Sequence, residues 1–153
     1  MTIERAEVAD LQQILELQYL AYRSIAQLYN DFSIEPLTQT IESVRLEFDR
    51  GIFLKVVGDL SEIIGSVRAY IDDNTVYIGK LMVNPSNQGQ GIATKLIYAI
   101  EREYSVERYE LFTGSRCVDN LRLYERLGYV RFKERAITSE ITLVYLEKYV
   151  GGK

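Results

Sequence analysis

Three strand-like segments follow one another directly in the middle of the chain, with only short polar turns between them. They cover residues 52–57, 62–71 and 75–83, and they are rich in β-branched and aromatic side chains. The turns are Gly58-Asp59 and residues 72–74. Connections this short join antiparallel neighbours, because a parallel return needs a crossover of about a dozen residues or more. The pattern therefore predicts an antiparallel meander around which the rest of the chain must pack.

Apolar residues at helical spacing predict helices before and after this meander. The predicted helices cover residues 10–29, 38–50, 91–104 and 119–127. Asp10 is the expected N-cap of the first, and Gly51 and Gly128 are expected to end the second and the fourth. Further strands are predicted at residues 2–6, 109–113, 129–135 and 140–149.

The order of these elements is β-α-α-β-β-β-α-β-α-β-β. It predicts an α/β (mixed α+β) fold, with a mostly antiparallel central sheet of about seven strands and four helices on both faces. The chain of 153 residues contains no internal repeat, low-complexity tract or linker. A single domain over residues 1–153 is therefore expected.

Histidine is absent, and Cys117 is the single cysteine. These facts exclude a Ser-His or Cys-His nucleophile pair, a histidine metal site and an intramolecular disulfide, and we expect no metal. The net charge is −4 and no basic stripe is visible, so no nucleic-acid partner is expected. No apolar run is long enough to cross a bilayer, the N-terminal residues lack an apolar signal core, and the thiol is unpaired, so a cytoplasmic protein without a membrane partner is expected.

The most informative segment runs from Leu81 to Ile97 and reads as a strand, a loop with two glycines and an amphipathic helix. Free amides at a helix start and the positive end of the helix dipole favour phosphate binding. Gly89 and Gly91 let the backbone approach an anion, because no Cβ intervenes. A P-loop would end in Gly-Lys-Ser/Thr, and a dinucleotide fingerprint would have a third glycine where Thr94 stands, so neither motif is present.

The segment Gln88-Gly89-Gln90-Gly91-Ile92-Ala93 resembles the Gln/Arg-x-x-Gly-x-Gly/Ala loop of the GNAT superfamily, the CoA-dependent N-acetyltransferases. A second block, from Asn120 to Tyr129, looks like the Asn-x-x-x-Tyr-x-x-x-Gly-aromatic helix of that family. This block lies one strand after the helix that follows the loop, where the family has it. The resemblance extends to the order of elements over nearly the whole chain and implies a GNAT-like fold.

The resemblance implies an acyltransferase that moves acetyl from acetyl-CoA, its cosubstrate, to a primary amine by direct attack. The pyrophosphate would lie on loop amides, here Gln88, Gly89, Gln90, Gly91, Ile92, Ala93 and Thr94. The pantetheine arm would pair like an extra strand with Leu81, Met82 and Val83. Asn120 would bind the same arm. Tyr124 would stand near the sulfur, where its phenol can protonate the departing thiolate.

The general base is the point at which the chain departs from the family pattern. Many members carry a glutamate on the strand before the loop, and here Tyr77-Ile78-Gly79-Lys80-Leu81 contains no carboxylate. A water chain or a carboxylate such as Glu35 would replace it. Lys80 is otherwise expected to be a solvated charge, and Glu47 part of a solvated face. The missing glutamate also supports an alternative, a catalytically weak acyl-CoA-binding module that regulates a partner.

The acceptor is not encoded in a motif. Tyr29 and Phe32 are the candidates for contact with it, and Cys117 is expected to be a half-buried packing residue. A small-molecule amine and a protein amine both stay open as acceptors. The use of acyl groups other than acetyl and the formation of a homodimer also stay open.

Overall fold

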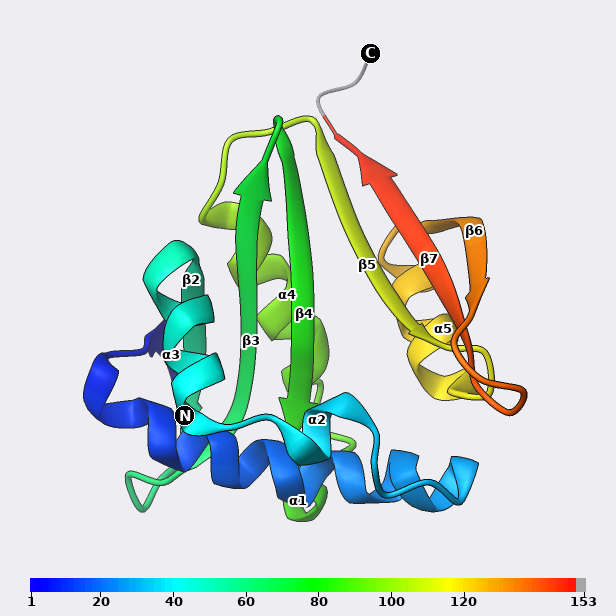
Figure 1. Ribbon diagram of the computed structural model, residues 1–153. Coiled ribbons are helices and arrows are strands. Elements are labelled where there is room, and N and C mark those ends of the chain that lie inside the picture. The colour runs from blue at the N-terminus through cyan, green and yellow to red at the C-terminus, as the bar shows by residue number, and fades with distance from the viewer. Residues whose placement is uncertain (151–153) are drawn as a thin grey trace.

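The predicted meander forms the centre of a larger sheet, as a computed structural model that describes residues 1–150 of the chain shows (Figure 1). Its strands, β2 (Ile52–Val57), β3 (Ile63–Asp72) and β4 (Thr75–Val83), pair antiparallel in chain order. The strand β1 (Thr2–Arg5) pairs antiparallel with β2 at one edge. The other half contains β5 (Arg108–Gly114), β6 (Val130–Ala136) and β7 (Thr142–Tyr149).

Residues 1–150 form one seven-stranded sheet in the order β1-β2-β3-β4-β5-β7-β6. Its neighbours are antiparallel except for β4 and β5, which run parallel because α4 (Ile92–Arg102) connects them as a crossover. This architecture confirms the predicted mixed, mostly antiparallel sheet.

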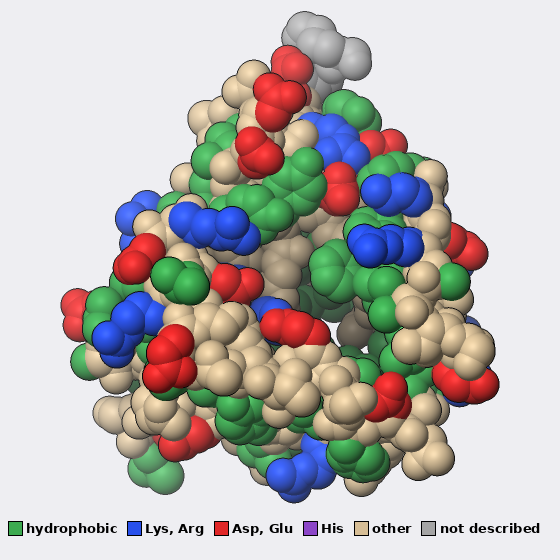
Figure 2. Space-filling model, viewed as in Figure 1, with side chains coloured by type: hydrophobic (Ala, Val, Ile, Leu, Met, Phe, Trp, Pro, Cys, Tyr) green, Lys and Arg blue, Asp and Glu red, His purple; other side chains and the backbone are tan. Residues whose placement is uncertain are grey.

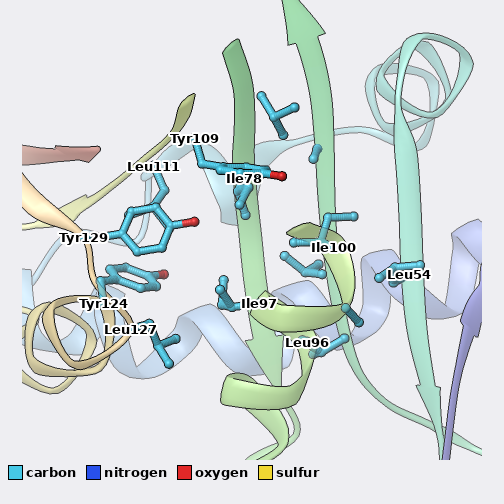
Figure 3. Close-up of a cluster of buried hydrophobic side chains, with 14 of the residues drawn as sticks. Leu54, Ile78, Leu96, Ile97, Ile100, Tyr109, Leu111, Tyr124, Leu127 and Tyr129 are labelled. Carbon is cyan, nitrogen blue, oxygen red and sulfur yellow. The ribbon is translucent and has the colours of Figure 1, made fainter. Parts of the chain in front are cut away.

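Helices cover both faces of the sheet (Figure 1). One face carries α4 and α5 (Val118–Arg126), and the other carries α1 (Leu11–Tyr29), α2 (Glu35–Thr38) and α3 (Ile41–Arg50). Two single turns of 3-10 helix, η1 (Val8–Asp10) and η2 (Pro85–Asn87), precede α1 and α4. The main cluster of buried side chains lies between the sheet and the α4/α5 layer (Figure 3).

The helix predicted over residues 38–50 is wrong at its start, where the structure has two helices. Pro36 occupies the first turn of α2, and the backbone of Gln39 is extended, with a ψ of 137°. Thr40 then caps α3, because its hydroxyl accepts a hydrogen bond from the amide of Ser43 at 3.2 Å. The division matters for the site because α2 carries Glu35.

The capping role predicted for Asp10 is also wrong. Its carboxylate makes no cap hydrogen bond to α1. It accepts instead from the backbone amide of Glu7 at 2.8 Å and from Lys55 of β2 at 2.8 Å. Asp10 therefore closes the η1 turn and ties it to the sheet.

Candidate active site

The strands β4 and β5 are paired only at their first residues. The parallel register joins Thr75 to Arg108, Val76 to Tyr109 and Tyr77 to Glu110. Beyond this point the edges of the two strands that face each other have no strand partner among residues 1–150. Figure 1 shows the strands moving apart toward their C-terminal ends, and Figure 2 shows a hollow on the α1 face. Free backbone groups along such an edge can pair with an extended ligand.

The residues expected to pair with the pantetheine arm, Leu81, Met82 and Val83, lie on this free part of β4. A β-bulge at Lys80 and Leu81 begins this segment, because the register with β3 shifts between Ser66 and Arg68. A bulge bends its strand and increases the local twist, which accounts for the divergence of β4 from β5.

Lys80 lies at this bulge with a left-handed φ of 51°. The expectation that it is a solvated charge is wrong. Its side chain is only 15% exposed, and its Nζ lies 2.9 Å from Oε1 of Glu35. The one-turn helix α2 therefore brings a carboxylate to β4, which has none of its own.

The connection from β4 to α4 presents free backbone amides. Asn84 caps the η2 turn through its side chain. In the described chain, the amides from Gly91 to Thr94 have no hydrogen-bond acceptor, and the first helical bond runs from the amide of Lys95 to the carbonyl of Gly91 at 3.2 Å. The start of α4 thus offers several N–H donors together with the positive end of the helix dipole.

The two loop glycines are needed for backbone conformation and leave open space. Gly89 and Gly91 have φ values of 81° and 77°, in the left-handed region that side chains disfavour. A Cβ added to either would meet no protein atom within 4 Å. Free amides beside open space, at the start of an 11-residue helix, fit a bound pyrophosphate.

Within this segment, Ile92 is 2% exposed and its side chain belongs to the core. Only its amide is therefore available to a ligand. The side chains of Gln88 and Gln90 are exposed, and those of Ala93 and Thr94 are partly exposed.

Asn120 and Tyr124 lie one helical turn apart on α5. Asn120 donates from Nδ2 to Oγ1 of Thr113 at 3.3 Å, so it lies against the free end of β5. Its amide oxygen accepts no hydrogen bond from the described residues, which leaves it available to a ligand between the strands. Asn120 therefore borders the gap between β4 and β5.

Tyr124 is 5% exposed, and its ring packs beside Tyr129 with 6.2 Å between centroids (Figure 3). Figure 3 shows its hydroxyl directed away from α5, toward Ile97. This hydroxyl has no hydrogen-bond partner among residues 1–150. Burial first, and then Tyr22 and Cys117, raise the pKa of the phenol well above its usual value near 10.

Sequence reasoning did not single out Tyr22, which lies on α1 and approaches Tyr124 from the other face of the sheet. Burial raises the pKa of Tyr22, while the charge of Arg68 lowers it and that of Glu35 raises it. Tyr22 is therefore near enough to Arg68, Glu35 and Tyr124 for their charges to interact. The available signal was its spacing of four residues from Gln18, which places two polar side chains on the apolar face of the first helix.

The two residues expected to contact the acceptor lie in different surroundings. Tyr29 is 5% exposed, and its hydroxyl accepts a hydrogen bond from the amide of Arg116 at 3.0 Å. It therefore ties the end of α1 to the β5–α5 connection. Phe32 is 55% exposed in the loop that follows α1. Their contact with an acceptor stays a prediction.

Cys117 is 8% exposed at the N-cap position of α5, so it is more buried than expected. Over residues 1–150, no group of three or more His, Cys, Asp or Glu side chains is arranged to hold a metal ion. In the same part of the chain, no helix has both the length and the apolar character that crossing a bilayer requires.

The model of the acetyltransferase (GNAT) family matches residues 11–129, which include the glycine loop, Asn120 and Tyr124. The chain belongs to the GNAT acetyltransferase family. Membership assigns it to acetyl-CoA-dependent acyl transfer. A comparison with curated proteins finds no match.

Solved GNAT structures share the whole fold at low sequence identity. PaiA N-acetyltransferase from Thermoplasma acidophilum, solved with coenzyme A, is 17% identical, with a TM-score of 0.77 over 98% of this chain and 100% of that chain. The ribosomal-protein-S18-alanine N-acetyltransferase from Escherichia coli is 14% identical, with a TM-score of 0.80 over 99% and 95%. Phosphinothricin acetyltransferase from Sinorhizobium meliloti, solved with AcCoA, is 18% identical, with a TM-score of 0.77 over 98% and 88%. At these identities the likeness establishes the fold of this GNAT protein.

The loop is tested by comparing Gly91→Asp with Gly91→Asn. Both variants place a side chain of similar size on a left-handed residue, and only the first adds a negative charge beside the free amides. We expect Gly91→Asp to bind CoA at least about 10-fold more weakly than Gly91→Asn, measured by calorimetry. Equal affinities in two folded variants would show that the pyrophosphate binds elsewhere.

Proposed function

We propose that this protein is an N-acetyltransferase that moves acetyl from acetyl-CoA to a primary amine by direct attack. The observation that carries the proposal is the gap between β4 and β5, because a row of free amides lies at one end of it and Asn120 lies at its side. When bound, acetyl-CoA supplies the thioester that makes the acetyl group transferable. Direct attack is also consistent with the absence of histidine and with the burial of Cys117.

The free edge of β4 would bind and orient the pantetheine arm. Its two amides can pair with the backbone between Leu81 and Val83, as an added strand would. A backbone N–H near Val83 would then point at the thioester oxygen and stabilise the negative charge that develops there. Asn120, held by Thr113, would fix the arm from the β5 side.

Tyr124 would protonate the thiolate that leaves. Its raised pKa makes this phenol a weaker acid than a phenol in water. The thiolate leaves into the same buried surroundings, however, and desolvation there also raises the pKa of its thiol. The transfer therefore stays favourable enough for general acid catalysis. The free hydroxyl of Tyr124 needs to break no existing hydrogen bond to donate its proton.

The proton of the acceptor ammonium must leave before attack. β4 carries no carboxylate, and Glu35 on α2 is the carboxylate that lies against it through Lys80. We propose that either a water chain or Glu35 accepts this proton. The acceptor is a small-molecule or protein amine, and the free thiol of Cys117 favours a reducing, cytoplasmic location.

A thiol-release assay with acetyl-CoA and a panel of amines tests the proposal against a binding module that regulates a partner. We expect CoA release that depends on the added amine, and stabilisation of the fold by CoA, because a ligand that binds only the folded state raises the melting temperature. Stabilisation by CoA without release for any amine would favour the regulatory module. The absence of both stabilisation and release would contradict CoA binding itself.

Tyr124→Phe tests the acid, because it keeps the ring and its packing and removes only the hydroxyl. We expect kcat and kcat/KM to fall together by about 100-fold, with little change in CoA affinity. Since the pKa of Tyr124 lies above its usual value, the phenol stays protonated through about pH 9, so the ratio of wild-type to variant kcat is expected to be constant from about pH 7 to pH 9.

Tyr109→Phe is the control for that measurement, because it removes a phenol whose hydroxyl bonds the carbonyl of Glu101, at the opposite end of β5. We expect it to lower stability without changing kcat. A Tyr124→Phe enzyme with normal kcat but weakened CoA binding and a lower melting temperature would make Tyr124 a packing residue.

A further inference from the structure

Gly79 marks open space on the face of the sheet that carries α1 and α2. It stands opposite Arg68 in the register of β3 and β4, and the Arg68 side chain reaches α1 and α3. A Cβ on Gly79 would therefore point to the same face, and it would meet no atom within 4 Å. This space belongs to the face on which Figure 2 shows the hollow, opposite the side that α4 covers.

The Glu35–Lys80 ion pair borders this space. Lys80 follows Gly79 at the bulge, on the free edge of β4 and directly before Leu81. Its side chain is mostly buried, whereas that of Glu35 is 62% exposed. The ammonium is thus held in place while the carboxylate can swing toward solvent. A ligand bound by Lys80 would lie next to the strand residues that are proposed to carry the thioester.

A second ion pair lies deeper and is fixed by neutral partners. Arg68 is 4% exposed, and its Nη1 lies 2.5 Å from Oε1 of Glu47. Its Nη2 donates to Oε1 of Gln18, and Gln39 donates to Glu47 at 2.9 Å. The solvated position expected for Glu47 is therefore wrong. Breaking this pair would leave a buried charge without compensation, so it acts as a scaffold.

The buried pair also positions the exposed one. Gln18 donates at 2.8 Å to the carbonyl of the residue after Glu35, which fixes α2 over the sheet. The two pairs are near enough for their charges to interact. Burial works to raise the pKa of Glu47, yet that pKa lies below its usual value, and the charges of Arg68 and Lys80 contribute to lowering it. Two cations and two anions therefore form one compact group beside the hollow.

We propose that the Glu35–Lys80 pair selects an acceptor that carries a carboxylate close to its amine, as an amino acid does. The acceptor ammonium would replace Lys80 as the partner of Glu35, and its carboxylate would replace Glu35 as the partner of Lys80. Each charge then keeps an opposite partner when the pair opens. A polyamine would bring a second cation next to Lys80 and leave that ammonium without an anion, so it is disfavoured. This inference rests on the proposed N-acetyltransferase function.

The experiment compares amino acids with the matching amino-acid amides, which keep the amine and lose the carboxylate, and with spermidine. We expect wild-type kcat/KM to be at least about 10-fold higher for the acid than for its amide. Lys80→Met should remove this preference by lowering kcat/KM for the acid, while kcat/KM for the amide changes by less than about 3-fold. Lys80→Arg keeps the charge and should keep most of the preference.

Lys55→Met is the matched control. Lys55 is also 15% exposed and pairs at 2.8 Å with Asp10, but it lies on β2, away from the gap. The Lys55→Met variant should leave the ratio of kcat/KM for the acid to kcat/KM for the amide unchanged. CoA stabilisation of each variant checks that it is folded and binds the cosubstrate.

Equal or better use of amides or spermidine by the wild type would overturn the inference and leave the N-acetyltransferase function intact. An unchanged ratio of acid to amide in folded Lys80→Met would overturn it as well. If no amine supports CoA release although CoA binds, the proposed function fails and this inference fails with it.

Discussion

The site depends on the parallel pair of strands β4 and β5, which are hydrogen-bonded at one end and separated at the other. Three register pairs hold β4 to β5, and the bulge at Lys80 turns the rest of β4 away. The two halves still share one core, because the buried cluster under α4 and α5 contains side chains from both sides of the gap. The opening is therefore a built feature of the fold, and its walls are fixed by packing.

The helix α1 holds the opening from the other face. Its 19 residues span about 28 Å, which is enough to cross from one half of the sheet to the other. Near its start, Leu11 and Ile14 pack with Phe53 of β2. At its end, Tyr29 packs with Cys117 and bonds the amide of Arg116 after β5. The two ends of α1 therefore contact opposite halves of the sheet.

The two faces of the sheet present different chemical groups at the gap. On the α4 side, neutral amides and a helix dipole are suited to a diphosphate, whose charge they can stabilise without side-chain cations. On the α1 side, side-chain charges occur in balanced pairs that are suited to a charged acceptor. Tyr124 lies in the buried cluster under α4 and α5, and it is near enough to Tyr22 on the α1 face for the two phenols to affect each other.

Strand bounds and the glycine loop could be predicted from the sequence because neighbouring residues in the chain determine them. The strand 75–83 has the predicted bounds, and a Cβ added to either loop glycine would meet no protein atom, as expected where the backbone must approach an anion. The split between α2 and α3 was missed because helical periodicity continues across it, although Pro36 and Thr40 signal it.

The buried charges were not readable, because their partners are distant in the chain. Arg68 and Gln18 are 50 residues apart, so no pattern in either segment shows that they meet. Lys80 and Glu47 were expected to be solvated for the same reason, because their partners Glu35 and Arg68 are distant in the chain. Such contacts are set by the arrangement of α1 and α2 over the sheet, which only the tertiary structure defines.

Amide hydrogen exchange with and without CoA tests the central claim most directly, because it reports which backbone groups a ligand covers. Slower exchange on CoA binding is expected in two stretches, residues 78–83 of β4 and residues 88–94 of the loop and α4. The edge strand β6 should be unaffected and serves as the internal reference. CoA binding that protects neither stretch would contradict the assignment of the gap between β4 and β5 as the cosubstrate site.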